Sequence, residues 1–223
     1  MSSQDTTVVG ILLAGGESRR MGQDKASLPA HTNSPHSTLL AQQVALLQQL
    51  PLARLWISRH PSHPPLDPAL AALTVNDASS DSHLGPLAGI HSALQHDQQQ
   101  AQQHTQLKAD AVLIIPVDLP LLDKATVSQL LNTGVQSGQA CYFLQDYLPL
   151  YLPLVSRSES DTNITDYLEQ TLNAPESEPK IRRSIRGLLS LCQPLSLQPA
   201  DASKLTNTNT RDEWNAVQSR QGN

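Results

Sequence analysis

The stretch from Val8 to Lys25 constrains the fold more than any other part of the chain. It opens with an apolar, β-branched run, Val8 to Leu13, which is typical of a strand buried in a parallel sheet. Three small residues, Ala14, Gly15 and Gly16, end the run and allow the backbone to turn tightly and approach a ligand closely. The pattern favours an α/β fold in which this turn lies at the carboxyl end of a strand, where open α/β sheets bind ligands.

The residues after the turn add positive charge to it. Consecutive backbone N–H groups in such a turn form a concavity that binds anions, and Arg19, Arg20 and Lys25 follow in the same loop. The Walker pattern and the GxGxxG dinucleotide fingerprint both fail, because Gly16 is followed by Gly22 and then by Lys25. The loop therefore predicts a phosphate cradle of another type, and a solvated basic loop is the alternative.

Composition narrows the class of protein. A chain of 223 residues suffices for one substantial α/β domain. The net charge of -5 and the pI near 5.8 argue against a surface that binds nucleic acid or an anionic membrane. We find no apolar run of ~18 residues and no secretory signal pattern, so we expect a cytoplasmic protein without a membrane span. Cys141 and Cys192 lack metal-ligand spacing, and we expect both to be reduced core residues.

Periodicity predicts alternating helices and strands along the rest of the chain. We expect helices over 38–50, 123–131, 162–172 and 180–192, and a last helix that ends at 218. We expect strands over 54–58, 111–117 and 141–144, and a short strand that ends near 75. The most apolar strand, 111–117, ends at Asp118. A carboxylate at the end of a central strand faces the crevice that binds ligands, although Asp118 taken alone is more readily explained as a cap or turn residue.

Four segments in a fixed order resemble a known family. Residues 13–25 read LAGGESRRMGQDK, which resembles the LAGGxSxRMGxDK motif of the molybdenum cofactor guanylyltransferases, a branch of the Rossmann-like nucleotidyltransferases. Three later segments resemble further motifs of that family: GPLAG at 85–89, PVDLPLL at 116–122 and NTNTRD at 207–212. The resemblance implies a three-layer α/β/α fold with a mostly parallel sheet. It implies a single nucleotidyltransferase domain over 1–223, in which the Gln- and His-rich tract 95–108 is a candidate mobile insertion.

The resemblance also implies a reaction and its residues. GMP would pass from GTP to molybdopterin, with Mg²⁺ bound and pyrophosphate released, and a cofactor carrier or an acceptor enzyme would be a further partner. The family's catalytic residues correspond to Arg20, Lys25 and Asp118, and its Mg²⁺ ligand corresponds to Asp118. The family's nucleotide contacts correspond to Leu13, Ala14, Gly15, Gly16, Lys25, Asp77 and Asp118.

The chain departs from the family in its last motif, where Arg211 stands in place of Pro, and at two places near the substrates. Leu148-Pro149 or Leu152-Pro153 stands where the family usually carries His-Pro near the acceptor, and 56–58 lacks an Asn that the family often has near the guanine. A molybdopterin cytidylyltransferase or another sister nucleotidyltransferase is one alternative, although LAGG in place of LAAG favours guanine. A nucleotide-binding protein without turnover is the other, and the two departures near the substrates keep it open.

Two further clusters are candidates for ligand binding. His91, His96 and His104 would be metal ligands, but no carboxylate or Cys pattern joins them, and a solvated helix end or a mobile loop explains the tract better. The basic cluster Arg182, Arg183 and Arg186 would clamp the acceptor's phosphate or a carrier protein, and a solvated helix face is the alternative.

Overall fold

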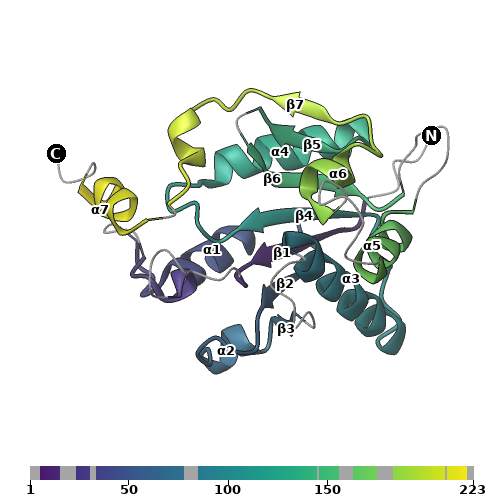
Figure 1. Ribbon diagram of the computed structural model, residues 1–223, viewed down its shortest axis with the longest axis horizontal. Helices are drawn as coiled ribbons and strands as arrows, with labels where there is room; N and C mark the ends of the chain where they lie inside the picture. Colours follow the sequence, from purple (N-terminus) through teal and green to yellow (C-terminus); the bar gives the residue numbers. More distant parts are fainter. Residues whose placement is uncertain are drawn as a thin grey trace.

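The computed structural model describes residues 6–15, 24–30, 34–77, 85–144, 146–155, 163–174, 183–208 and 210–219. Within these residues one seven-stranded sheet has the order β3-β2-β1-β4-β6-β5-β7 (Figure 1). The strands are β1 (Val8–Leu13), β2 (Arg54–Arg59), β3 (Thr74–Asn76), β4 (Ala111–Pro116), β5 (Cys141–Phe143), β6 (Asp146–Pro153) and β7 (Leu195–Leu197).

The sheet is mostly parallel. β1 pairs in parallel with β2 and β4, β2 pairs in parallel with β3, and β5 pairs in parallel with β7. β6 is antiparallel to both β4 and β5. β1 and β4 lie inside the sheet and are almost entirely buried, which is why both read as continuous apolar runs in the sequence.

Helices cover both faces of the sheet, which confirms the predicted α/β/α layering. Along β1, Val8 and Leu12 pack into one apolar cluster, whereas Val9 and Ile11 pack into the other, because alternate side chains of a strand point to opposite faces. The first cluster includes residues of α1 (Leu39–Leu47) and α4 (Lys124–Ser137). The second includes residues of α3 (Gly85–Gln103), α5 (Ile164–Asn173) and α6 (Ile185–Leu189).

The remaining elements are short or lie near the end of the chain. They are the 3-10 helices η1 (Lys25–Ser27) and η3 (Ala202–Leu205) and the helices α2 (Pro68–Ala71) and α7 (Arg211–Ser219). α1 and α4 each follow an N-cap residue of a type that favours helix starts: Thr38 accepts a hydrogen bond from the Ala41 amide, and Asp123 accepts one from the Thr126 amide. α4 runs beyond the predicted limit to Ser137.

One predicted element differs from the structure, and two strands were not predicted. The helix expected over 180–192 is the short α6, and the segment 175–182 lies outside the described residues. The periodicity does not predict β6 and β7, and β6 contains Pro149 and Pro153, which are unusual in a strand. Residues 95–103 of the Gln- and His-rich tract belong to α3. No described helix is long and apolar enough to cross a membrane.

Candidate active site

The carboxyl ends of β1, β2 and β4 meet at one edge of the sheet. Leu13 pairs with Ser58 on one side and with Pro116 on the other. The Ala14 amide donates to the Ser58 carbonyl at 2.9 Å, and the Asp77 amide donates to the Arg59 carbonyl at 2.9 Å. The loops that follow β1, β3 and β4 therefore all begin at the same edge of the sheet. The arrows of β1 and β4 point toward this edge in Figure 1.

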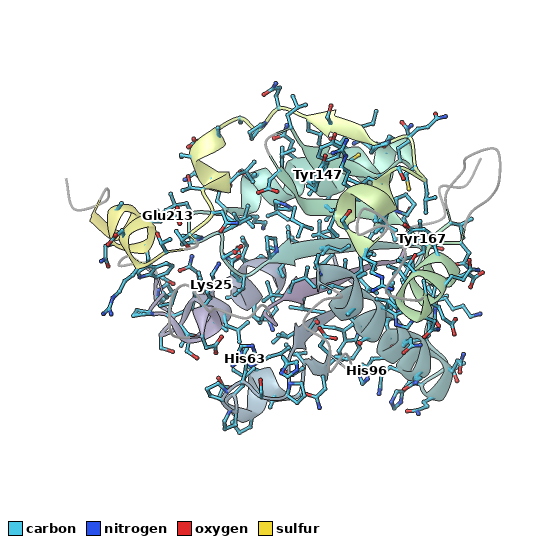
Figure 2. The ribbon with its side chains drawn as sticks, in the orientation of Figure 1. Lys25, His63, His96, Tyr147, Tyr167 and Glu213 are labelled. Atoms are coloured by element: carbon cyan, nitrogen blue, oxygen red, sulfur yellow. The ribbon has the colours of Figure 1, made fainter. Side chains whose placement is uncertain are left out.

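Lys25 and Asp118 form an ion pair at this edge. The Lys25 Nζ donates to Asp118 Oδ2 at 2.9 Å, and each side chain is 17% exposed. Figure 2 labels Lys25 on this side of the sheet. The Asp118 Oδ1 atom is buried and has no hydrogen-bond partner within the described part of the chain. A buried carboxylate oxygen left in this state is suited to accept a ligand's cation or a donor group.

The loop that carries Lys25 is fixed by its neighbour Asp24. Asp24 caps η1 by accepting from the Ala26 amide at 3.1 Å and from the Ser27 hydroxyl at 2.8 Å. Its Oδ2 atom also accepts a hydrogen bond from Arg59 Nη2 at 2.6 Å. Burial acts to raise the pKa of Asp24, but the hydrogen bonds from Arg59 and Ser27 outweigh it and hold this pKa below its ordinary value.

The late motif of the sequence returns to the end of β4. Thr208 is fully buried, and its amide and hydroxyl both donate to the Asp118 carbonyl, at 3.1 and 3.3 Å. The Oδ1 atom of Asn207, the preceding residue, is buried and has no hydrogen-bond partner among the described residues. Asn209 lies outside the described residues.

Two glycines of the motifs allow close packing at this edge. A Cβ on Gly15 would lie 3.3 Å from the backbone nitrogen of His60. A Cβ on Gly89 would lie 2.4 Å from Ser58 Oγ, so the second glycine of GPLAG lets the start of α3 contact the end of β2. The motif glycines thus have a packing reason that the sequence pattern alone did not supply.

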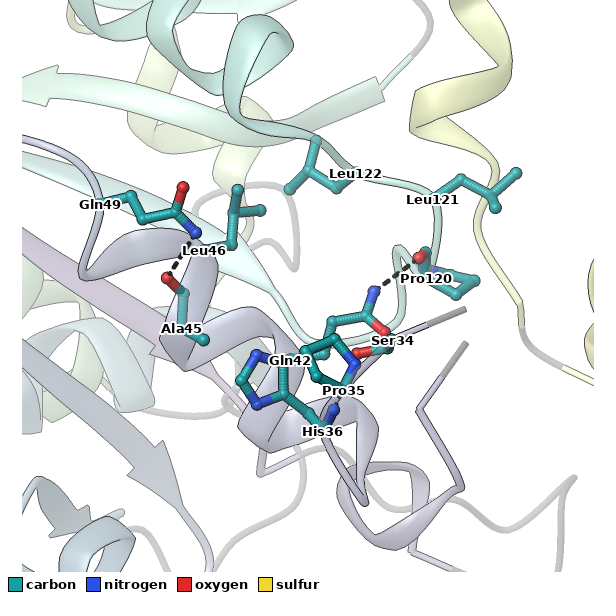
Figure 3. A pocket seen from close by; sticks show the side chains of 10 residues that line it. All are labelled: Ser34, Pro35, His36, Gln42, Ala45, Leu46, Gln49, Pro120, Leu121 and Leu122. Carbon is teal, nitrogen blue, oxygen red and sulfur yellow. Dashed lines mark hydrogen bonds between the residues drawn. The ribbon is translucent and has the colours of Figure 1, made fainter. Parts of the chain in front are cut away.

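A small cavity lies beside the segment that follows Asp118. It has a volume of about 310 Å³ between α1 and residues 120–122 (Figure 3). Gln42 donates to the Pro120 carbonyl at 2.9 Å, and the buried Gln43 donates to the Leu119 carbonyl at 2.7 Å. These two amides fasten the segment after β4 to α1 and so restrict where Asp118 can stand.

The structure brings together most of the residues that the sequence singled out. Those at the edge described above are Leu13, Ala14, Gly15, Lys25, Asp77 and Asp118. Gly16, Arg19 and Arg20 lie outside the described residues, as does Arg182. Arg59 was not singled out by sequence reasoning. A basic residue at the end of a strand beside β1 is the signal that would have found it.

The two candidate positions for the family's His-Pro lie at different edges. β6 is antiparallel to β4, and Leu150 pairs with Ile114, so Leu148-Pro149 lies toward the edge that carries Asp118. Leu152 and Pro153 pair with Val112 and Ala111, toward the opposite edge. Of the two, Leu148-Pro149 therefore lies toward the end of the sheet that carries Lys25 and Asp118.

The His and Arg residues that the sequence singled out as further candidates make contacts away from Lys25 and Asp118. The described residues contain no group of three or more His, Cys, Asp or Glu side chains that could hold a metal ion. His96 packs edge-to-face against Trp56, with ring centroids 4.5 Å apart. Arg183 donates to the Ala174 carbonyl, and Cys141 and Cys192 are both free thiols, the first buried and the second partly exposed.

Known proteins resemble this chain in sequence and in fold. The family described as MobA-like NTP transferase domain matches residues 10–188. A protein of Xanthomonas euvesicatoria pv. vesicatoria (strain 85-10), named molybdenum cofactor guanylyltransferase, is 29% identical over 208 residues and covers 93% of each chain. A nucleotidyl transferase from Methanothermobacter thermautotroptrophicus has a TM-score of 0.65 at 13% identity and covers 96% of this chain and 97% of its own. The 2-C-methyl-D-erythritol 4-phosphate cytidylyltransferase from Thermus thermophilus has a TM-score of 0.59 at 13% identity, with 94% and 96% covered. The two solved structures bear on the fold alone.

Proposed function

Because the chain belongs to the family of MobA-like NTP transferase domains, we propose that it transfers GMP from GTP to molybdopterin and releases pyrophosphate. It is an enzyme of the nucleotidyltransferase class. The relative named molybdenum cofactor guanylyltransferase supports this choice of reaction. The observation that carries the proposal is the meeting of Lys25 with Asp118 at the carboxyl edge of the sheet. Nucleotidyl transfer needs a cation for the triphosphate and a carboxylate for a metal ion at one place.

The residues at the end of β4 fit a hard cation. Asp118 Oδ1 and Asn207 Oδ1 are buried oxygens without hydrogen-bond partners within the described residues, and Thr208 ties this segment to the Asp118 carbonyl. Mg²⁺ prefers oxygen ligands and in phosphate sites is commonly held by one or two carboxylates together with substrate phosphates. Asp118 would hold Mg²⁺, and Asn207, which adjoins Thr208, is a further candidate ligand. The bound ion would neutralise charge on the phosphates during transfer.

The side chains of the first loop act on the triphosphate. The Lys25 ammonium would donate to phosphate oxygens and stabilise the charge of the leaving pyrophosphate, together with Arg20. The backbone of Leu13, Ala14, Gly15 and Gly16 would line the phosphates, because a tight turn at a strand end presents its N–H groups to an anion. The acceptor needs no general base, since a phosphate monoester with a second pKa of about 6 is already largely deprotonated near neutral pH.

Guanine selectivity would come from the segments beside the first loop. Asp77 lies at the edge of the sheet through its amide bond to the Arg59 carbonyl, and a carboxylate there would accept from the guanine's N–H groups. The LAGG form of the first motif supports guanine over cytosine. A cofactor carrier or an acceptor enzyme would receive the product.

Nucleotide-dependent unfolding tests the proposal. A ligand that binds the native state raises the melting temperature by mass action, so GTP with Mg²⁺ should raise it more than CTP or ATP does. Pyrophosphate release from GTP should then depend on added molybdopterin. Preference for CTP would assign the chain to the sister cytidylyltransferases, and GTP binding without pyrophosphate release would assign it to the nucleotide-binding proteins without turnover.

A further inference from the structure

Arg59 ends β2 with its guanidinium buried inside the protein. The residue is 3% exposed, and its Nη2 donates to Asp24 Oδ2 at 2.6 Å and to the Pro64 carbonyl at 3.2 Å. Its Nη1 reaches Asp24 Oδ1 at 3.5 Å. A buried guanidinium is stable only where it is paired, and the carboxylate that pairs with it here belongs to the first loop.

Asp24 links Arg59 to the 3-10 helix that begins at Lys25. The same carboxylate caps η1, whose first residue is Lys25, by accepting from the Ala26 amide and the Ser27 hydroxyl. The start of η1 is therefore fastened to β2 by a charged hydrogen bond. From this anchored position the Lys25 side chain reaches Asp118, which lies 93 residues further along the sequence.

The backbone of the same strand end holds the other segments of the site. The Ser58 carbonyl accepts from the Ala14 amide at 2.9 Å, where the chain leaves β1. The Arg59 carbonyl accepts from the Asp77 amide at 2.9 Å, where the chain leaves β3. The end of β2 thus contacts the glycine turn, the lysine loop and the segment after β3, and Arg59 is the residue whose side chain fixes the lysine loop.

We propose that Arg59 is a positioning residue that holds Lys25 opposite Asp118 through Asp24. Arg59 contacts no reacting atom and acts only through the position of Lys25. Its relevance to GTP rests on the proposed function, whereas its effect on Lys25 does not. A side chain that serves stability alone would change the melting temperature and leave the environment of Lys25 in the folded protein unchanged.

The reactivity of Lys25 gives a test that needs no nucleotide. An amine-reactive acylating reagent is applied to the folded protein, and labelling at each lysine is followed by mass spectrometry. We expect Lys25 to react slowly in the wild type, because it is paired and 17% exposed, and several-fold faster in Arg59→Met. The exposed Lys124 serves as the internal control, and Asp118→Asn shows the rate at Lys25 once the charge of its partner is removed. An unchanged rate at Lys25 in folded Arg59→Met would overturn the proposal.

Nucleotide affinity gives the second readout. Arg59→Met should raise the KM for GTP about tenfold, and Arg59→Lys, which keeps one charged hydrogen bond to Asp24, should restore most of the affinity. In a Lys25→Ala background Arg59→Met should cause no further loss, because the group that it positions is gone. Additive losses in this cycle would show that Arg59 acts elsewhere.

A double variant in which both charges are removed tests the proposal if Arg59→Met does not fold. Asp24→Asn with Arg59→Met removes both charges, and the side-chain oxygen of the introduced amide can still cap η1. This double variant should fold and should show the fast labelling of Lys25, because the anchor to β2 is lost. Wild-type labelling in the double variant would refute the proposal. A wild type that does not bind GTP would refute the proposed function and leave the labelling result as an independent test of Arg59.

Discussion

Lys25 and Asp118 form an ion pair, with Lys25 Nζ and Asp118 Oδ2 2.9 Å apart. Each is 17% exposed, so the pair is screened by water less than a surface pair would be. The partners that surround it are placed by their own contacts: Asp24 by Arg59, and Thr208 by the Asp118 carbonyl. At the scale of the residue, the candidate site is a set of neighbouring charges in which the buried Asp118 Oδ1 atom has no hydrogen-bond partner among the described residues.

Replacement of Asp118 by Asn should abolish turnover while the protein stays folded. The amide keeps the volume of the carboxyl group but is a weaker ligand for a hard cation. It also weakens the charged hydrogen bond to Lys25, which costs roughly 1 to 3 kcal/mol of stability. Pyrophosphate release should fall by more than about a hundredfold, the order of loss seen when a group that stabilises transition-state charge is removed. Near-normal transfer at saturating Mg²⁺ would show that another residue holds the metal.

Replacement of Lys25 by Met should have opposite effects on metal and nucleotide. The ammonium donates to Asp118 Oδ2, so its removal should strengthen binding of Mn²⁺ added without nucleotide, measured by the EPR signal of free Mn²⁺. GTP binding should weaken by about 1.5 to 3 kcal/mol, the value of a hydrogen bond to a charged group. The double variant with Asp118→Asn is the control and should lose the added Mn²⁺ binding. Equal Mn²⁺ affinity in Lys25→Met and the wild type would contradict the competition.

At the scale of the element, α3 is attached to β2 at two places. Near its start Gly89 contacts Ser58, and further along Asp97, which is 1% exposed, accepts from Arg54 at 2.6 and 2.9 Å and from the Trp56 indole at 2.8 Å. The hydrogen bonds to Asp97 raise the pKa of Arg54. One attachment lies beside the candidate site, and the other holds the Gln- and His-rich part of the helix.

Substitution of Gly89 by Ala should loosen the first attachment. The added Cβ would lie 2.4 Å from Ser58 Oγ, so the hydroxyl must rotate or the helix must shift, at a cost of about 1 to 3 kcal/mol for overpacking. Denaturant unfolding measures the loss. The matched double variant with Ser58→Ala removes the clashing oxygen and should recover most of the stability. Failure of this rescue would place the cause outside the Gly89–Ser58 contact.

Amide hydrogen exchange should divide the Gln- and His-rich tract into two parts. Asp97 and Ala101 are buried on α3, so the amides of 95–103 should exchange slowly. The segment 104–108 follows the helix and is exposed, and we expect faster exchange there than in α3, although the His104 and Gln106 amides donate to the Gln100 and Ala101 carbonyls. Fast exchange over the whole of 95–108 would favour a mobile insertion that includes the end of α3. Slow exchange throughout would rule out mobility in the tract.

At the scale of the whole molecule, the strand order places the site. β1 and β4 are neighbours inside the sheet, with β2 beyond β1, so loops that are distant in sequence leave the sheet at the same edge. The antiparallel β6 adds Leu148-Pro149 to the neighbourhood of that edge. The two apolar clusters on either side hold the strands in register and leave the edge to the polar residues.

Stability of the whole molecule should fall as the pH is lowered. Burial holds the pKa of His91 below its ordinary value, although Glu169 acts to raise it, and the pKa values of Asp24 and Asp123 are also lowered in the folded protein. The unfolded chain therefore binds more protons, so the free energy of unfolding decreases with acidification. The contribution of His91 to stability should start to be lost below about pH 6.5, and that of the Asp24 and Asp123 carboxyl groups below about pH 3.9.

Denaturant unfolding between pH 7.5 and pH 3 measures this loss, a range that brackets ordinary His and Asp pKa values of about 6.5 and 3.9. His91→Leu should flatten the decline between neutral pH and about 5, while the decline at lower pH should stay. An unchanged slope in His91→Leu would show that another group carries the proton uptake in that range.

The sequence by itself determined the local structure and the identity of the chemical groups. β1, β4 and the caps of α1 and α4 were predictable, because apolar runs and N-cap residues act on their immediate neighbours in the chain. The motifs also singled out residues, such as Lys25 and Asp118, that the structure brings to the carboxyl end of the sheet. β6 escaped prediction, because its prolines disfavour a strand that pairing with β4 and β5 nevertheless stabilises.

Only the tertiary structure decided which of these groups meet. The ion pair between Lys25 and Asp118 and the burial of Arg59 against Asp24 depend on the order and register of β2, β1 and β4. Those are set by the packing of two apolar clusters over the whole sheet rather than by any local pattern. A sequence motif names the charges of a site, whereas the distances between them follow from how distant strands pair.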